Sequence, residues 1–232
     1  MTLSEIFENL LFYDENDNSR LQKLIIVIIG LYILTVAFFL IFGITGSDLQ
    51  AILSAVILVI WLAVMALIFK LLRNTEIIRS YYRWFYLPGV VVLAISLETP
   101  IYFIGGGLSG TAESLEHDLI LTIPVYLGIG IGSYIVNWKR KMNPGEFFLL
   151  GGIMGFIIEI VLLGRFDLIW FFLGGVLGMY GAVNSVFSPA QDDNEKEFKN
   201  ILLNLFFGTI LCCIFIVIGA FLGHFLYESF FM

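Results

Sequence analysis

The chain has 232 residues, of which 59% are hydrophobic, 16% aromatic and 13% charged, and its mean hydropathy is +0.97. Such a composition leaves too little polar surface to cover a water-soluble globule, so a membrane must replace water over much of the surface. The net charge of -7 argues against nucleic acid as a partner.

Residues 1–20 lack the basic start and the continuous apolar core of a signal peptide. Apolar residues recur at helical spacing from Leu3 to Leu11, which predicts a short amphipathic helix on the cytoplasmic interface. Its polar face is acidic and suits anionic headgroups poorly. We therefore expect this segment to pack against the protein's own basic loops.

Seven apolar stretches follow, each close to the roughly 20 residues that a helix needs to cross a hydrocarbon core. The approximate spans are 24–47, 49–70, 84–108, 118–138, 145–164, 168–188 and 200–228. The sequence thus predicts an all-α integral membrane protein with short loops, in which residues 21–232 form one seven-helix domain. The fifth and sixth stretches would give the same loop charges as a re-entrant hairpin, but their lengths favour two full spans.

The basic residues predict the orientation. Eleven of the twelve Lys and Arg residues fall on one side of the seven-span pattern, and only Arg165 falls on the other. Because basic loops are retained in the cytoplasm, we expect a cytoplasmic amino terminus and an external carboxyl terminus. The expected location is a cell membrane, with membrane lipids as partners. Whether the protein forms a homo-oligomer or joins a partner subunit is left open.

Glycine is concentrated in the second part of the chain, where 19 of the 23 glycines lie at or after Gly105. The fourth to seventh spans each carry a pair four residues apart. These pairs are Gly128 with Gly132, Gly151 with Gly155, Gly174 with Gly178, and Gly219 with Gly223. Small residues at this spacing let membrane helices approach closely, so we expect these four helices to form a tight bundle.

Two carboxylates lie well inside the apolar stretches. Glu98 precedes Thr99 and Pro100 in the third span, where the proline removes one backbone hydrogen bond of the helix. Glu159 lies in the fifth span, about 8 Å below Gly164 at the helical rise. If the third span ends in its glycine-rich stretch, both carboxylates lie at nearly the same depth.

A charged side chain at the bilayer centre costs about 2.5 to 3.5 kcal/mol, and burial disfavours the charged form of a carboxyl group. We therefore expect Glu98, Thr99 and Glu159, with His224 as a further candidate, to bind a proton, a small cation or a cationic solute in a shared cavity open to the outside. The opposing interpretation is that each carboxyl group is protonated and bonded to a neighbouring helix, or that Arg165 neutralises Glu159.

Four residues around the start of the fourth span resemble a metal-ligand set, although a polar connection that caps this helix explains them more simply. They are Glu113, Glu116, His117 and Asp118.

Glu146 has a structural interpretation, because Asn143-Pro-Gly-Glu146 is typical of a helix start with a reciprocal cap. No cofactor is indicated.

Three functions of different class fit these residues. The leading one is a small-solute or ion transporter or channel, which is supported by the mid-span acids, by Pro100 and Pro124 in neighbouring spans and by the glycine-rich bundle. The second is an intramembrane enzyme acting on a lipid or isoprenoid, with Glu98 and Glu159 as general acid and base. The third is a scaffold or accessory subunit without chemistry of its own. A retinal protein is excluded, because no lysine lies between residues 200 and 232.

Overall fold

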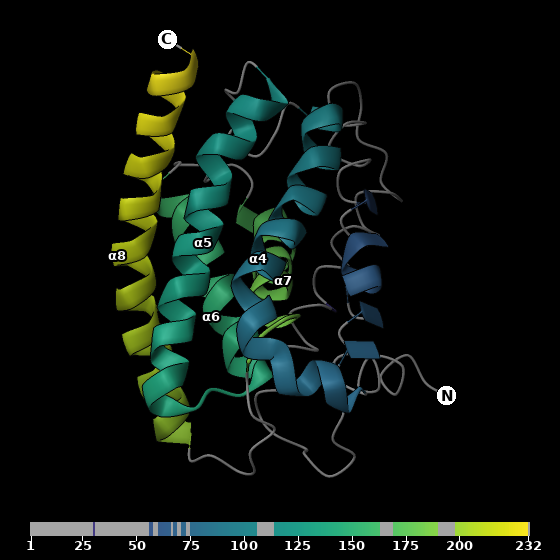
Figure 1. Ribbon diagram of the computed structural model, residues 1–232, viewed down its shortest axis with the longest axis vertical. Helices are drawn as coiled ribbons and strands as arrows, with labels where there is room; N and C mark the ends of the chain where they lie inside the picture. Colours follow the sequence, from purple (N-terminus) through teal and green to yellow (C-terminus); the bar gives the residue numbers. More distant parts are fainter. Residues whose placement is uncertain are drawn as a thin grey trace.

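The computed structural model describes residues 30, 56–57, 60–65, 67–68, 71–72, 75–105, 114–162, 169–189 and 198–231. These residues are helical apart from caps and short turns, and no strand occurs among them. The helices run side by side along the long axis of the molecule (Figure 1). They are α4 (Glu76–Gly105), α5 (Leu115–Arg140), α6 (Pro144–Phe156), the π-helix η1 (Ile157–Leu162), α7 (Ile169–Ser185) and α8 (Phe198–Phe231).

The amino-terminal predictions fall largely outside the described residues. The interfacial segment 1–20 lies outside them altogether, and of the first predicted span only Gly30 is described, as helical. The described positions between residues 56 and 72 are also helical, and among them Trp61 and Met65 are buried.

Three of the described helical stretches are long and apolar enough to cross a membrane. They are Leu115–Arg140, Pro144–Val161 and Lys199–Ser229. Helix α4 begins at Glu76, ahead of residue 84 where the apolar stretch begins. Hydropathy marks only the apolar part of a helix, and the hydrogen-bonded backbone continues through the polar residues before it.

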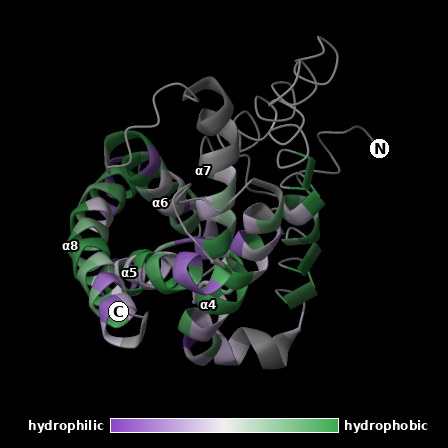
Figure 2. Ribbon diagram, turned by 90° about the horizontal axis from the view of Figure 1, so that it is seen from above, coloured by the Kyte–Doolittle hydropathy of each residue, from purple (hydrophilic) through white to green (hydrophobic). Residues whose placement is uncertain are grey.

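The helices pack in two main pairs, α5 with α8 and α6 with α7, and α4 lies beside α5. Helix α8 forms one edge of the molecule (Figure 1). Viewed from above, its apolar residues extend around much of its circumference (Figure 2). Large side chains such as Phe206, Phe221 and Phe225 are exposed on it, which is the expected surface of a helix in contact with lipid.

Glycines bring the backbones of α5 and α8 together. A Cβ atom added at Gly128 would lie 2.7 Å from the carbonyl of Phe215, and one at Gly132 would lie 2.7 Å from the backbone nitrogen of Cys212. From the other side, a Cβ at Gly223 would lie 2.8 Å from the carbonyl oxygen of Ile120. No larger residue fits at these positions unless the two helices separate.

Glycines also bring the backbones of α6 and α7 close together. A Cβ atom at Gly152 would lie 2.9 Å from the Leu177 carbonyl oxygen, and one at Gly181 would lie 2.8 Å from that of Phe148. Close backbone approach is how helices associate where lipid and side chains are equally apolar.

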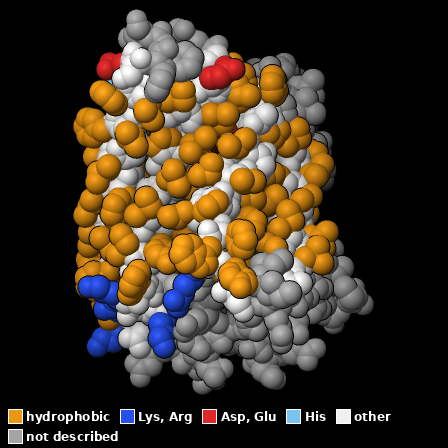
Figure 3. All heavy atoms as spheres, in the orientation of Figure 1, with side chains coloured by type: hydrophobic (Ala, Val, Ile, Leu, Met, Phe, Trp, Pro, Cys, Tyr) orange, Lys and Arg blue, Asp and Glu red, His pale blue; other side chains and the backbone are white. Residues whose placement is uncertain are grey.

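Charged side chains gather at the two ends of a broad apolar belt (Figure 3). Lys139, Arg140 and Lys141 are exposed at the end of α5, and we call this the basic end of the molecule. Glu116 at the start of α5 and Glu228 near the end of α8 are exposed at the opposite end, which we call the acidic end.

Candidate functional site

Glu98 lies on α4 and is fully buried. The helix continues through Pro100 to Gly105. Two residues before Glu98, the Ser96 hydroxyl donates to the Leu93 carbonyl at 2.8 Å and accepts a hydrogen bond from Trp61 Nε1 at 3.0 Å. This hydrogen bond from Trp61 connects the helical positions around it to α4.

Glu159 lies in the π-helical segment η1 and is also fully buried. A π-helical turn interrupts the regular hydrogen-bond ladder, and such turns are frequent at functional sites. The Tyr180 hydroxyl of α7 donates to Glu159 Oε1 at 3.1 Å. A Cβ atom at Gly155 would overlap the Tyr180 ring, so the glycine leaves the space that the ring occupies.

A stacked pair of tyrosines joins the two carboxyl groups. The rings of Tyr126 on α5 and Tyr180 on α7 have centroids 4.9 Å apart and planes at 17°. Both Glu98 and Glu159 lie close to the two tyrosine hydroxyls. We call these four residues the acid–tyrosine cluster. Its members come from α4, α5, η1 and α7, so the fold assembles it from four separate segments.

The chemistry of this cluster suits a proton or a small cation. A tyrosine hydroxyl donates and accepts hydrogen bonds, and a carboxyl group donates only when protonated. Two carboxylates in one buried site disfavour double ionisation, because burial and mutual repulsion both act against it. One bound proton or cation relieves both effects.

A second polar group lies nearer the basic end and is structural. The predicted helix start is confirmed: Asn143 N donates to Glu146 Oε2 at 2.7 Å, and Glu146 N donates to Asn143 Oδ1 at 2.8 Å. Asn204 of α8 donates to Glu146 Oε1 at 2.6 Å and accepts from Arg140 at 3.3 Å. These bonds hold α8 to α6 and α5.

A third group crosses the centre of the molecule through Asn184. Its side-chain oxygen accepts from the Tyr86 hydroxyl at 2.6 Å, and its nitrogen donates to Ser133 Oγ at 3.0 Å and to the Phe147 carbonyl at 2.8 Å. One side chain therefore links α7 to α4, α5 and α6.

The remaining binding candidates are placed differently. Thr99 is half-buried on α4 beside Glu98. His224 is 64% exposed and its Nε2 lies 3.1 Å from Oε1 of Glu228 on the same helix, so it lies on the surface of α8 rather than in the buried cluster. Arg165 lies outside the described residues.

Three of the four candidate metal ligands are described, and they lie in the capped first turn of α5. Ser114 Oγ accepts from His117 N at 3.2 Å and caps α5. The His117 ring stacks on Tyr227 with centroids 3.8 Å apart, while Asp118 is buried and Glu116 exposed. Among the residues that the structure describes, no group of three or more His, Cys, Asp or Glu side chains is placed to hold a metal ion. Glu113 lies outside those residues.

Sequence reasoning missed Tyr126 and Tyr180, although one signal was available. Tyrosine in membrane helices is enriched at the interfaces, where its hydroxyl reaches water, and both residues lie deep within apolar stretches.

A search against family models, a search of curated proteins and a search of solved structures each found no match to this chain.

Proposed function

We propose that this protein spans a membrane seven times and binds a proton, or a small cation in its place, at the acid–tyrosine cluster during transport of an ion or small solute. The observation that carries the proposal is the pairing of two fully buried carboxyl groups, Glu98 and Glu159, with one stacked pair of tyrosines. Hydrophobic burial alone explains neither the acids nor the hydroxyl groups between them.

Three observations support the membrane frame. Three described helices have the length and apolarity of spans, large apolar side chains are exposed along α8, and basic and acidic residues occupy opposite ends (Figure 3). With basic loops retained inside the cell, the basic end and the amino terminus are cytoplasmic in this proposal and the acidic end is external.

The free-energy cost of burying charged carboxylates favours a site that holds a proton or a cation. An ionised side chain at the bilayer centre costs about 2.5 to 3.5 kcal/mol, and two carboxylates in one site repel each other. The site therefore holds a proton or a cation whenever it is closed, as it is in this structure, where neither carboxyl group is exposed. Release of that charge requires a conformation in which water reaches the cluster.

The tyrosines lie between the carboxyl groups. The Tyr180 hydroxyl donates to Glu159, and its ring stacks on that of Tyr126, whose hydroxyl has no hydrogen-bond partner among the described residues. Because a hydroxyl can accept one proton while donating another, the pair would relay a proton in a conformation in which the Tyr126 hydroxyl bonds to Glu98. A lipid substrate would need the helices to part before reaching either acid, so the buried geometry favours proton or cation exchange over lipid chemistry.

The test is proton and cation flux in liposomes that contain the purified full-length protein and an internal pH-sensitive dye. We expect an imposed gradient to drive flux in the native protein and at least a tenfold loss in Glu98→Gln and Glu159→Gln, which keep shape and remove the titrating group. Infrared difference spectra during a pH change should show a carboxyl band that the same substitutions remove.

Glu146→Gln is the matched control, because Glu146 is equally buried but lies in the helix cap, where glutamine also serves. Its flux should match that of the native protein. If all three variants retain native flux and the infrared band is absent, the acids are structural and the scaffold function gains support.

A further inference from the structure

A cavity of about 650 Å³ lies at the basic end between α4 and α5. It falls within the range of about 300 to 1,000 Å³ that is typical of small-molecule sites. Its lining residues are Arg83, Trp84, Leu87 and Pro88 of α4, Tyr134, Asn137 and Trp138 of α5, Lys141 after that helix, and Pro189 after α7. The cavity involves no member of the acid–tyrosine cluster.

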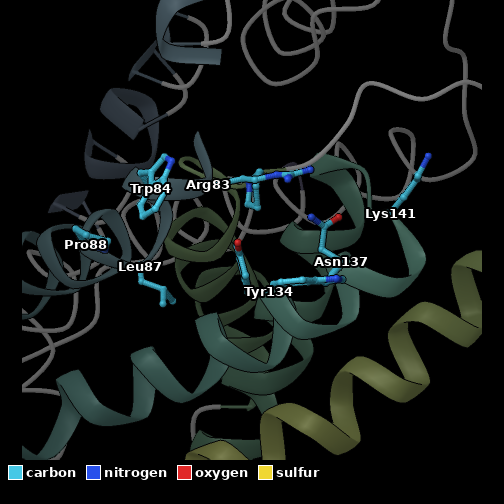
Figure 4. Close-up of a pocket in the computed structure, with 9 residues that line it drawn as sticks. Arg83, Trp84, Leu87, Pro88, Tyr134, Asn137 and Lys141 are labelled. Carbon is cyan, nitrogen blue, oxygen red and sulfur yellow. The ribbon is translucent and has the colours of Figure 1, made fainter. Parts of the chain in front are cut away.

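The polar groups of this cavity are hydrogen-bond donors. The Tyr134 hydroxyl, the Asn137 amide and the Arg83 guanidinium lie near one another, and Lys141 extends at one side (Figure 4). The side-chain oxygen of Asn137 accepts from Met142 N at 2.6 Å, which leaves its amide nitrogen to donate. Among the lining residues that the structure describes, none is acidic, so the electrostatics favour an anion.

The surroundings of the cavity are those of a membrane boundary. The indoles of Trp84 and Trp138 are each 79% exposed beside it, and exposed tryptophans mark the level of lipid headgroups. Leu87 and Pro88 extend the lining along α4 away from the charged residues. A ligand that fits therefore has an anionic head and an apolar body.

We propose that this cavity binds an anionic phospholipid of the adjoining leaflet. Arg83, Lys141, Tyr134 and Asn137 hold the phosphate, and the acyl chains run along Leu87 and Pro88 into the hydrocarbon layer. Basic pockets between membrane helices are a known way of recognising such headgroups. Arginine and lysine supply the charge, while the hydroxyl and the amide add directional hydrogen bonds.

Tryptophan fluorescence tests the proposal directly, because two of the four indoles lie at the cavity. The full-length protein is reconstituted into phosphatidylcholine vesicles, and either brominated phosphatidylglycerol or brominated phosphatidylcholine is added as a quencher. We expect brominated phosphatidylglycerol to quench the fluorescence at a lower mole fraction than brominated phosphatidylcholine does. This difference between the two lipids should disappear in a protein with Trp84→Phe and Trp138→Phe.

Single substitutions test whether the preference for phosphatidylglycerol depends on the residues of the cavity. Arg83→Gln should weaken the preference for phosphatidylglycerol about fivefold, since one basic residue near a membrane surface contributes roughly that factor. Tyr134→Phe keeps the ring and should also reduce the preference. Lys139→Gln is the matched control, since Lys139 is exposed at the same end but does not line the cavity; it should retain the native preference.

Three results would overturn the proposal. Equal quenching by both lipids in the native protein would show that the cavity does not select anions. An equal loss in Lys139→Gln and Arg83→Gln would assign the preference to diffuse surface charge. Loss of the preference in millimolar inorganic phosphate, but not in a chloride salt of equal ionic strength, would show that a soluble anion displaces the lipid and is the preferred occupant of the site. Circular dichroism confirms that each variant is folded before it is scored.

Discussion

Gly155→Ala is expected to displace Tyr180 and so disconnect it from Glu159. The added Cβ atom would lie 2.5 Å from Cγ of the tyrosine ring, about 0.9 Å short of the 3.4 Å at which ordinary contact begins. The ring cannot shrink, so either the side chain turns away or α6 and α7 move apart. Both outcomes lengthen the 3.1 Å hydrogen bond to Glu159.

The magnitude follows from two opposing effects. Overpacking a well-packed site costs about 1 to 3 kcal/mol, while replacing glycine by alanine inside a helix contributes about 1 kcal/mol of stability. The free energy of unfolding should therefore fall by up to about 2 kcal/mol. Gly178→Ala is the matched control on α7, because among the described residues its Cβ would meet only the flexible end of Leu62, at 3.3 Å. It should be as stable as the native protein or slightly more so.

Thermal unfolding in detergent and proton flux in liposomes measure the two consequences separately. Gly155→Ala should lose both stability and flux, whereas Tyr180→Phe keeps the ring and should lose flux with less change in unfolding. If Gly155→Ala unfolds at the same temperature as Gly178→Ala and keeps native flux, then the close packing around Tyr180 does not control the cluster, and the reasoning is wrong.

Three further experiments test the packing of the helices and the orientation of the protein. Asn184→Leu removes three buried hydrogen bonds and should lower the free energy of unfolding by about 1 to 3 kcal/mol; an unchanged unfolding temperature would show that these bonds contribute nothing net. Gly219→Leu should prevent stable folding, since even a Cβ there overlaps the backbone of α5, whereas Ala220→Leu on the exposed face of the same helix should be tolerated in size-exclusion and circular dichroism measurements. In a cysteine-free background, Lys139→Cys should react with an impermeant thiol reagent only from the cytoplasmic side and Glu116→Cys only from outside; reaction of both from one side would contradict the proposed orientation.

Some features could be predicted because their cause is local in the sequence. The helix start at Asn143 depends only on residues within one turn, so the four consecutive residues from Asn143 to Glu146 are enough to predict its reciprocal cap. The two buried acids were also visible, since a carboxylate inside an apolar stretch is unusual in itself. Hydropathy also predicted membrane helices, because the preference of each side chain for lipid or water depends on that residue alone.

Other features depend on contacts between distant segments and could not be predicted in this way. The π-helical segment around Glu159 has no distinctive composition. Tyr126 and Tyr180 carry no charge, and their stacking is set by how α5 and α7 pack. Asn204 reads as one polar residue at the start of a long apolar helix, and only the assembled bundle shows that it completes the cap of Glu146.

The distribution of polar bonds suggests where the molecule opens. Asn184 and the pair of Glu146 with Asn204 cross-link the helices on the side of the acid–tyrosine cluster that faces the basic end. On the other side, α4 contains Pro100, α5 contains Pro124 and α6 continues as the π-helical segment. Each of these features weakens the regular backbone ladder, as Pro88 does in α4 on the basic side. Because more of these weakened segments adjoin the cluster on its acidic side, we expect water to reach Glu98 and Glu159 from that direction. Crosslinking the ends of α4 and α5 on the acidic side should then abolish proton flux, whereas a crosslink between α6 and α8 at the basic end should leave it intact.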